Sequence, residues 1–323
     1  MTRLLARYAA LFAALWAFLL AGQTAQAATE PVVRAPYRLD YGGWYTVAVT
    51  IDGEGPYDFI IDTGATHSLV FENLASQKNF PLSGDPLQRV LGVSSEAMQP
   101  TYVVGDIALG PAVLNNAHCV ILPDWTVRKR SPHGVLGLDF MASYQVVFDA
   151  ENHEIRLYAA TAEPEAQTRG WSKTRLKGNT FDRDFGEMFV VEGRLNRKRT
   201  RFLVDLGASG TVINGVAAGK TALLGDKSIS VNPMRGATRL NEIKDANDTA
   251  VTAQPILLER LMIGRTIWKK QVVVAHNAQI FEELGVQRTP FGLLGTDLLR
   301  DRSFVLDFPG GKMLIGPKAA GQS

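Results

Sequence analysis

The hydrophobic and polar positions of this chain alternate over short stretches, and they do so twice in the same order. Residues 44–70 (WYTVAVTIDGEGPYDFIIDTGATHSLV) form an alternating run, a polar turn and a second apolar run. Residues 188–213 (MFVVEGRLNRKRTRFLVDLGASGTVI) repeat that pattern in the second half. Alternation with period two, rich in β-branched and aromatic residues, predicts strands. Each run is therefore expected to be a β-hairpin whose second strand ends at an aspartate.

Further segments repeat in the same order. Residues 133–158 and 291–316 each contain two apolar residues and a glycine, a short helical turn and a closing hairpin. Between these elements, residues 102–122 and 255–275 each predict another hairpin. Long amphipathic helices are almost absent from the pattern. The sequence therefore predicts an all-β chain of two lobes that arose by internal duplication.

The chain length of 323 residues allows two lobes of ordinary size after a targeting segment. Arg3 and Arg7 precede an apolar stretch at 8–22, and Ala-Gln-Ala at 25–27 resembles a signal-peptidase site. We expect residues 1–27 to be a signal peptide cleaved after Ala27, although an uncleaved anchor is the alternative. The mature protein should be periplasmic or secreted, with no stable membrane span.

The predicted domain boundaries follow from the repeat. The first lobe is expected at 28–160, a polar, turn-rich linker at 161–184, and the second lobe at 185–323. A formal net charge of +2 gives no whole-molecule basic field that would favour nucleic acid. The one cysteine, Cys119, cannot form an internal disulfide, and we expect it in a buried strand.

Candidate chemistry lies in the repeated motif D-x-G-A-[TS]-x-[ST], which places Asp62 and Asp205 at equivalent positions. Two carboxylates that meet on a pseudo-twofold axis cannot both ionise easily, so they share a proton. Such a pair can activate a water and protonate a carbonyl oxygen, with no metal or cofactor. Gly64 and Gly207 would allow close backbone packing around the carboxylates, and Thr63 could brace the two loops.

These motifs resemble the aspartic peptidases of the retropepsin and pepsin type. The resemblance rests on apolar-apolar-DTGA, a second DxGA, and the apolar-apolar-Gly elements that end at Gly137 and Gly295. It implies a two-lobed pepsin/retropepsin-like aspartic protease fold, in which Gly137 and Gly295 support the aspartate loops. It also implies a monomeric endopeptidase that takes extended peptide segments. Short loops and the signal peptide are similar to bacterial periplasmic members, some of which process envelope or membrane-anchored proteins.

The same resemblance implies β-hairpin flaps over the substrate. The candidates lie in residues 88–100 and 232–242. Their expected tips, which would bind substrate, are Leu91, Gly92, Val93, Arg235, Gly236 and Ala237. An ordinary surface hairpin is the alternative for each segment.

Several positions leave alternatives open. Leu206 has no hydroxyl, so one of two expected hydrogen bonds between the aspartate loops should be missing. The rival functions are therefore a non-catalytic peptide-binding module and a structural envelope protein. Ala65 and Ala208 stand where a hydroxyl could lower the aspartate pKa, so the pair should work nearer neutral pH. The basic run at 194–201 is expected to be a solvated hairpin tip, with contact to anionic lipid or an acidic partner as the alternative.

Other chemistries are not supported by the sequence. It has no glycine-rich phosphate loop with lysine, no H-E-x-x-H, no G-x-S-x-G and no Cys/His cluster.

Overall fold

The fold is nearly all β, as the sequence predicts. The structure, a computed structural model, describes residues 30–40, 42–92, 96–125, 131–160, 162, 168–181, 186–219, 242–244, 250–252 and 254–320. The expected signal peptide and residues 232–241 of the expected second flap lie outside these residues.

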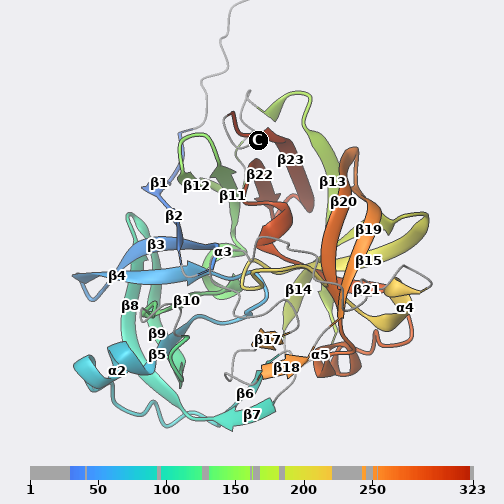
Figure 1. The fold of residues 1–323 in the computed structure, drawn as a ribbon. Coiled ribbons are helices and arrows are strands. Elements are labelled where there is room, and N and C mark those ends of the chain that lie inside the picture. Colours follow the sequence, from blue (N-terminus) through green and yellow to red (C-terminus); the bar gives the residue numbers. More distant parts are fainter. Residues whose placement is uncertain are drawn as a thin grey trace, which may run out of the picture.

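The first half forms a closed sheet of short strands (Figure 1). Its order is β2 (Arg38–Asp40), β3 (Trp44–Ile51), β4 (Glu54–Ile61), β10 (Gly134–Leu136), β5 (Leu69–Phe71), β9 (Ala112–Leu122) and β8 (Thr101–Leu109). An additional pairing of β3 with β8 closes it. Strand β10 lies between β4 and β5, parallel to β4, so the chain leaves β4 at Asp62 directly beside the end of β10.

The second half repeats that arrangement. Its order is β14 (Glu187–Leu195), β15 (Lys198–Val204), β21 (Phe291–Leu294), β16 (Val212–Ile213), β20 (Thr266–Ala275) and β19 (Gln254–Ile263). Here β14 pairs with β19 to close the sheet, and β21 runs parallel to β15. Each strand from β14 onward corresponds to one from β3 onward, so the internal duplication read in the sequence is visible in the topology.

A third group of strands joins the halves. It runs β1 (Val33–Pro36), β12 (Glu154–Ala159), β11 (Tyr144–Asp149), β22 (Arg302–Asp307), β23 (Lys312–Lys318) and β13 (Ser172–Thr180). Strands β11 and β22 pair antiparallel across the junction, with Val146 opposite Leu306. Strand β13 lies within 161–184, so part of the segment expected to be a linker is a strand that bridges β23 and β14.

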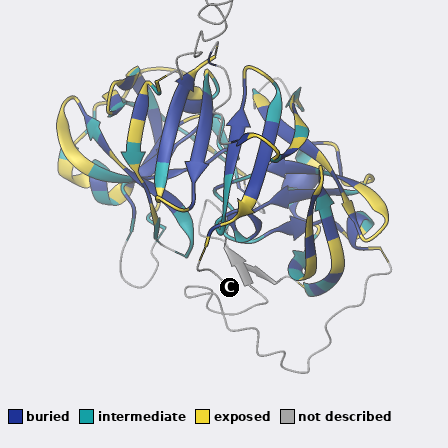
Figure 2. Ribbon diagram, turned by 90° about the horizontal axis from the view of Figure 1, so that it is seen from above, coloured by how far each residue is buried: buried dark blue, intermediate teal, exposed yellow. Residues whose placement is uncertain are grey.

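The hydrophobic core extends through this junction. Phe148 and Phe304 stack with ring centroids 4.4 Å apart, and Tyr45 from the first half contacts both rings. Figure 2 shows the buried residues gathered inside each half and along the strands between them. Cys119 is also buried, in β9, as expected.

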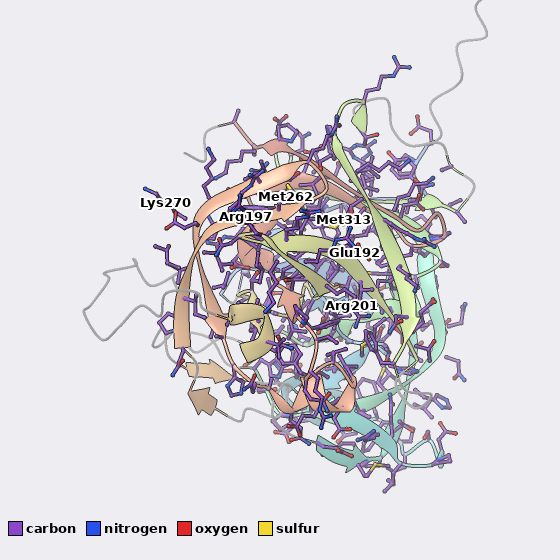
Figure 3. The ribbon with its side chains drawn as sticks, turned by 90° about the vertical axis from the view of Figure 1, so that its right-hand side faces the viewer. Glu192, Arg197, Arg201, Met262, Lys270 and Met313 are labelled. Atoms are coloured by element: carbon purple, nitrogen blue, oxygen red, sulfur yellow. The ribbon has the colours of Figure 1, made fainter. Side chains whose placement is uncertain are left out.

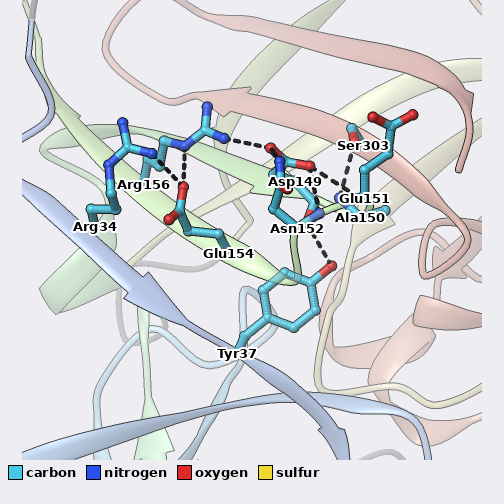
Figure 4. Close-up of polar contacts among 9 residues, drawn as sticks. All are labelled: Arg34, Tyr37, Asp149, Ala150, Glu151, Asn152, Glu154, Arg156 and Ser303. Atoms are coloured by element: carbon cyan, nitrogen blue, oxygen red, sulfur yellow. Dashed lines mark hydrogen bonds and ion pairs between the residues drawn. The ribbon is translucent and has the colours of Figure 1, made fainter.

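A buried ion pair lies in the same joining sheet (Figure 4). Arg156 bonds Asp149 and, at 2.5 Å, Glu154, while the Ala150 backbone N–H donates to Ser303 Oγ of the other half at 2.9 Å. Burial alone would raise the pKa of Asp149, but hydrogen bonds from Asn152 and the charge of Arg156 outweigh it and lower that pKa. The halves are therefore held together by polar as well as apolar contacts.

The remaining elements are short. They are α2 (Glu72–Lys78), α3 (Leu138–Met141), α4 (Gly215–Ala218), α5 (Gln279–Glu283), a 3-10 turn η2 (Thr296–Leu298), and the strand pairs β6 (Gln88–Leu91) with β7 (Glu96–Gln99) and β17 (Glu242–Lys244) with β18 (Ala250–Thr252). The basic run at 194–201 forms the β14–β15 hairpin, as predicted, with its turn at Asn196 and Arg197.

Candidate active site

Asp62 and Asp205 follow β4 and β15, at equivalent places in the two halves. Each backbone N–H continues the strand by donating to the neighbouring apolar-apolar-Gly strand, Asp62 to Leu136 O at 3.0 Å and Asp205 to Leu294 O at 3.1 Å. The two carboxyl groups lie close enough together for each to influence the pKa of the other. The fold therefore brings together the two aspartates that the sequence repeat singled out.

The backbone around the aspartates supplies hydrogen-bond donors from both halves. Asp62 Oδ1 accepts from Gly64 N at 2.7 Å and from Gly207 N, in the opposite loop, at 3.1 Å. Asp205 Oδ1 accepts from Ala208 N at 3.0 Å. The loop of one half thus fixes the carboxylate of the other.

Glycine is required at positions 64 and 207 because each loop lies against the opposite carboxylate. A Cβ on Gly64 would come within 2.6 Å of Asp205 Oδ1, and a Cβ on Gly207 would run into the Asp62 carboxylate. Any side chain at either position would push the two aspartates apart.

Thr63 braces the loops across the junction. Its Oγ1 donates to Val204 O at 2.7 Å and accepts from Leu206 N at 3.1 Å, and the side chain is fully buried. Leu206 has no hydroxyl with which to reciprocate, but it leaves both bonds of Thr63 intact and buries its side chain completely. Trp44 adds a further tie, since its Nε1 donates to Gly207 O at 2.6 Å.

Gly137 and Gly295 support the aspartate loops through two matching hydrogen-bond chains. In the first half, Gly137 N donates to Ser68 Oγ at 3.1 Å, and that hydroxyl donates to Asp139 at 2.8 Å. In the second half, Gly295 N donates to Thr211 Oγ1 at 3.2 Å, and Thr211 donates to Asp297 at 2.7 Å. Any larger residue at position 137 or 295 would collide with the loop backbone, because its Cβ would lie 2.6 Å from the nearest carbonyl carbon.

Residues 47–140, which contain Asp62, Gly137 and Asp139, match the family model described as aspartyl protease. The whole fold resembles the crystal structure of an aspartic proteinase from Irpex lacteus, with a TM-score of 0.51 and 11% identity over 90% of this chain and 98% of that chain. Together, the family match over residues 47–140 and the overall fold support a retropepsin- or pepsin-like family.

The family match and the fold support a peptidase acting on peptide substrates. At 11% identity the structural likeness concerns the fold alone, and it extends to the second half, which the family model does not reach. No curated protein matches the chain.

The surroundings of Asp62 and Asp205 shift the pKa values of the two carboxyl groups to different extents. Burial, and then the nearby charge of Asp62, raise the pKa of Asp205. Burial also raises the pKa of Asp62, but the N–H donors of Gly64, Gly207 and Ala65 oppose that rise. Asp62 therefore holds the negative charge more readily, and Asp205 holds the shared proton. The pKa of each carboxyl group is raised, which is the direction expected from the sequence.

Asp139 and Asp297 are the supporting carboxylates of the two halves. Burial raises the pKa of Asp297 to about 6, against the opposing hydrogen bond from Thr211. These carboxylates, with Ser68 and Thr211, were missed as site residues from the sequence. The signal was present, because each half places a hydroxyl six residues after the catalytic-loop aspartate and a carboxylate two residues after the supporting glycine.

One expected flap is described by the structure. Strands β6 and β7 pair with Leu91 opposite Glu96, so Leu91 and Gly92 lie at the tip, while Val93 lies outside the described residues, as do Arg235, Gly236 and Ala237. Leu91 packs against the apolar cluster of the second half that contains Phe281 and Phe291. The hairpin therefore reaches from one half of the chain to the other.

An ion pair fixes the hairpin in that position. Arg89 of β6 bonds Glu96 within the hairpin at 2.6 Å and Glu283 of α5, in the second half, at 2.7 Å. Both partners of the cross-half pair are half-buried, with side chains 21% and 26% exposed. Screening by water is thus weaker here than for a fully exposed pair.

Metal ligation has no support in the part of the chain that the structure describes, where no three His, Cys, Asp or Glu side chains cluster as a metal site would require. Within that part there is also no helix with the length and apolar character of a membrane span.

Proposed function

We propose that the chain is an exported aspartic endopeptidase in which Asp62 and Asp205 activate a water for attack on a peptide bond. The observation that carries this proposal is a hydrogen bond between the two aspartate loops: Gly207 N of the second loop donates to Asp62 Oδ1 of the first. The linked loops hold the two carboxyl groups beside each other, and the different surroundings give these groups unequal affinity for the shared proton.

Each aspartate has a role in this mechanism that follows from its surroundings. Asp62, ionised, removes a proton from the water as its oxygen bonds to the peptide carbonyl carbon, and Asp205 gives its proton to the carbonyl oxygen. The resulting tetrahedral diol then breaks its C–N bond. Asp62 returns the proton to the leaving nitrogen, Asp205 recovers one from the diol, and the dyad is restored with one proton.

Substrate would bind as an extended segment beneath the β6–β7 hairpin. An added strand satisfies the peptide's backbone hydrogen bonds, and alternate side chains point to opposite sides. Leu91 lies at the hairpin tip, where an apolar substrate side chain could contact it. The substrates that suit an exported enzyme are envelope or membrane-anchored proteins, in the periplasm or outside the cell.

One chain is sufficient for this site because the duplication supplies both aspartates, so we propose a monomer. The rival function, a peptide-binding module without catalysis, rested on Leu206. Thr63 keeps both of its bonds despite Leu206, and this observation favours catalysis over the rival.

The test is cleavage of an unbiased peptide library by the wild-type chain beside Asp62→Asn and Asp205→Asn, from about pH 4 to about pH 8. Cuts that disappear in both variants and with pepstatin would support the proposal. If all three proteins are folded, inert and equally able to retain peptides, the binding module is the correct function. Cuts that persist in the variants would place the chemistry elsewhere.

A further inference from the structure

The outer side of four strands in the second half carries a concentration of positive charge. Register places residues in rows across β15, β14, β19 and β20, because directly opposed residues share a face. One row reads Arg199, Arg194, Met262, Ile267; the adjoining rows pair Arg201 with Glu192 and Arg260 with Lys269. We call these residues, with Arg197 and Lys270, the basic face; Figure 3 views this side of the molecule.

Burial confirms that the basic face points to solvent. Its neighbours along the strands, Leu195, Phe202, Leu261 and Trp268, are buried on the inner side. Arg194, Arg199, Arg260 and Lys269 are exposed. The outer side of these strands therefore presents its charges to water.

Like charges oppose one another on this face. Arg194 stands directly opposite Arg199, and Arg260 directly opposite Lys269. Opposed like charges destabilise a sheet, unless an anion lies between them. Within the described residues, no carboxylate forms an ion pair with any of these four, so their charge is available to an external anion.

Acidic residues offset this charge only slightly. Glu192 lies opposite Arg201, and Glu259 stands beside Lys270 where the β19–β20 register skips one residue on each strand. A hollow of about 220 Å³ is lined by Arg199 and Arg201 together with Glu192, so a small anionic group has room beside the two arginines.

Two apolar side chains interrupt the cations. Met262 is half-buried and Ile267 is 38% exposed, and they oppose each other within the Arg199–Arg194 row. A surface that binds nucleic acid would combine cations with exposed aromatic rings for stacking. Trp268, the aromatic residue of β20, is buried instead. Cations around exposed aliphatic side chains suit the interface of a lipid bilayer.

From this combination we infer that the basic face docks the protein on an anionic phospholipid surface. Phosphate groups of the lipids would lie between the opposed arginines, and Met262 and Ile267 would enter the headgroup region. The docking would hold the enzyme beside membrane-anchored proteins, but it rests on charge and shape rather than on the proposed cleavage.

The experiment measures flotation of the full-length chain with neutral phosphatidylcholine vesicles and with vesicles that also contain phosphatidylglycerol. The variant Arg194→Gln/Arg199→Gln removes two charges from the basic face. Arg34→Gln/Arg38→Gln removes the same number from exposed positions in β1 and β2. Unfolding curves establish that each variant is folded, and binding to neutral vesicles subtracts any contribution of the apolar N-terminal segment.

We expect binding that requires the anionic lipid and weakens with salt. Each cation near an anionic surface multiplies partitioning about fivefold, so the basic-face variant should bind roughly thirtyfold more weakly and the control less than about threefold. Glu192→Gln should strengthen binding. Equal losses in both double variants, or equal binding to both vesicles, would overturn the inference. Retention on heparin without any vesicle binding would overturn it too, in favour of a soluble polyanion.

Discussion

Removal of the Thr63 hydroxyl is the most direct perturbation of the junction between the two aspartate loops. Thr63→Val keeps the shape of the side chain and removes one bond to Val204 O and one from Leu206 N, of 2.7 and 3.1 Å. Thr63 and Leu206 are fully buried, so water cannot readily replace the hydroxyl. A buried polar group left without a partner costs about 1–3 kcal/mol, and two such groups give an expected loss of about 2–6 kcal/mol.

The assay is urea-induced unfolding of wild type, Thr63→Val and Thr63→Ser, read by intrinsic fluorescence and fitted with a common slope. Thr63→Ser retains the hydroxyl and loses one methyl group, so its free energy of unfolding should fall by only about 1 kcal/mol. Peptide cleavage by Thr63→Val should fall with stability, because the loops that carry Asp62 and Asp205 are no longer tied. A Thr63→Val variant as stable as Thr63→Ser would refute the reasoning, since the hydroxyl would then contribute nothing.

Other predictions concern the dyad and the hairpin. Gly64→Ala should abolish cleavage by displacing Asp205, whereas Gly210→Ala, whose new Cβ would meet nothing within 4 Å, should remain active; equal activity of the two would contradict the steric argument. Burial raises the pKa of Asp205 to about 8, so wild type loses stability as pH rises from about 4, where the carboxyl of the unfolded chain ionises, to that value. Asp205→Asn should therefore gain stability over wild type across this range; a pH-independent difference in unfolding free energy would refute this. Glu283→Gln should accelerate amide exchange in β6–β7 about fivefold, for a pair worth about 1 kcal/mol, and Glu282→Gln, on the same helix, should not.

The fold could be predicted from the sequence because the same pattern of strands and turns occurs in both halves. A single DTG after an apolar strand occurs by chance, but the repeat of strands, turn and aspartate in the same order constrains both topology and register. Asp62 and Asp205 followed from that repeat alone. Their contact in the structure is a consequence of the matching positions of β4 and β15 beside β10 and β21.

Contacts between distant segments could not be read in that way. The bond of Trp44 to Gly207 and the ion pair of Arg89 with Glu283 each join residues from different halves, and neither has a counterpart in the repeat. Strand β13 was missed for a related reason, because its polar residues pair with β23 and β14 rather than follow a strong local pattern. Tertiary pairing decides such segments, whose own propensity is weak.

The asymmetry of the two loops can be explained by weighing what each side chain contributes. In a dimer of identical chains, both aspartate loops would carry the same residue at this position. In a fused chain the two loops can differ, so that one has a hydroxyl, as at Thr63, and the other an apolar side chain that packs in the core, as at Leu206. Full burial of a leucine side chain stabilises by about 1.5–3 kcal/mol, compared with about 1 kcal/mol net for one hydrogen bond. Leu206 is completely buried in the core cluster, and Thr63 alone supplies both bonds across the junction. Loss of the second hydroxyl therefore need not weaken the junction, and the two carboxylates keep the backbone N–H donors of Gly64, Gly207 and Ala208.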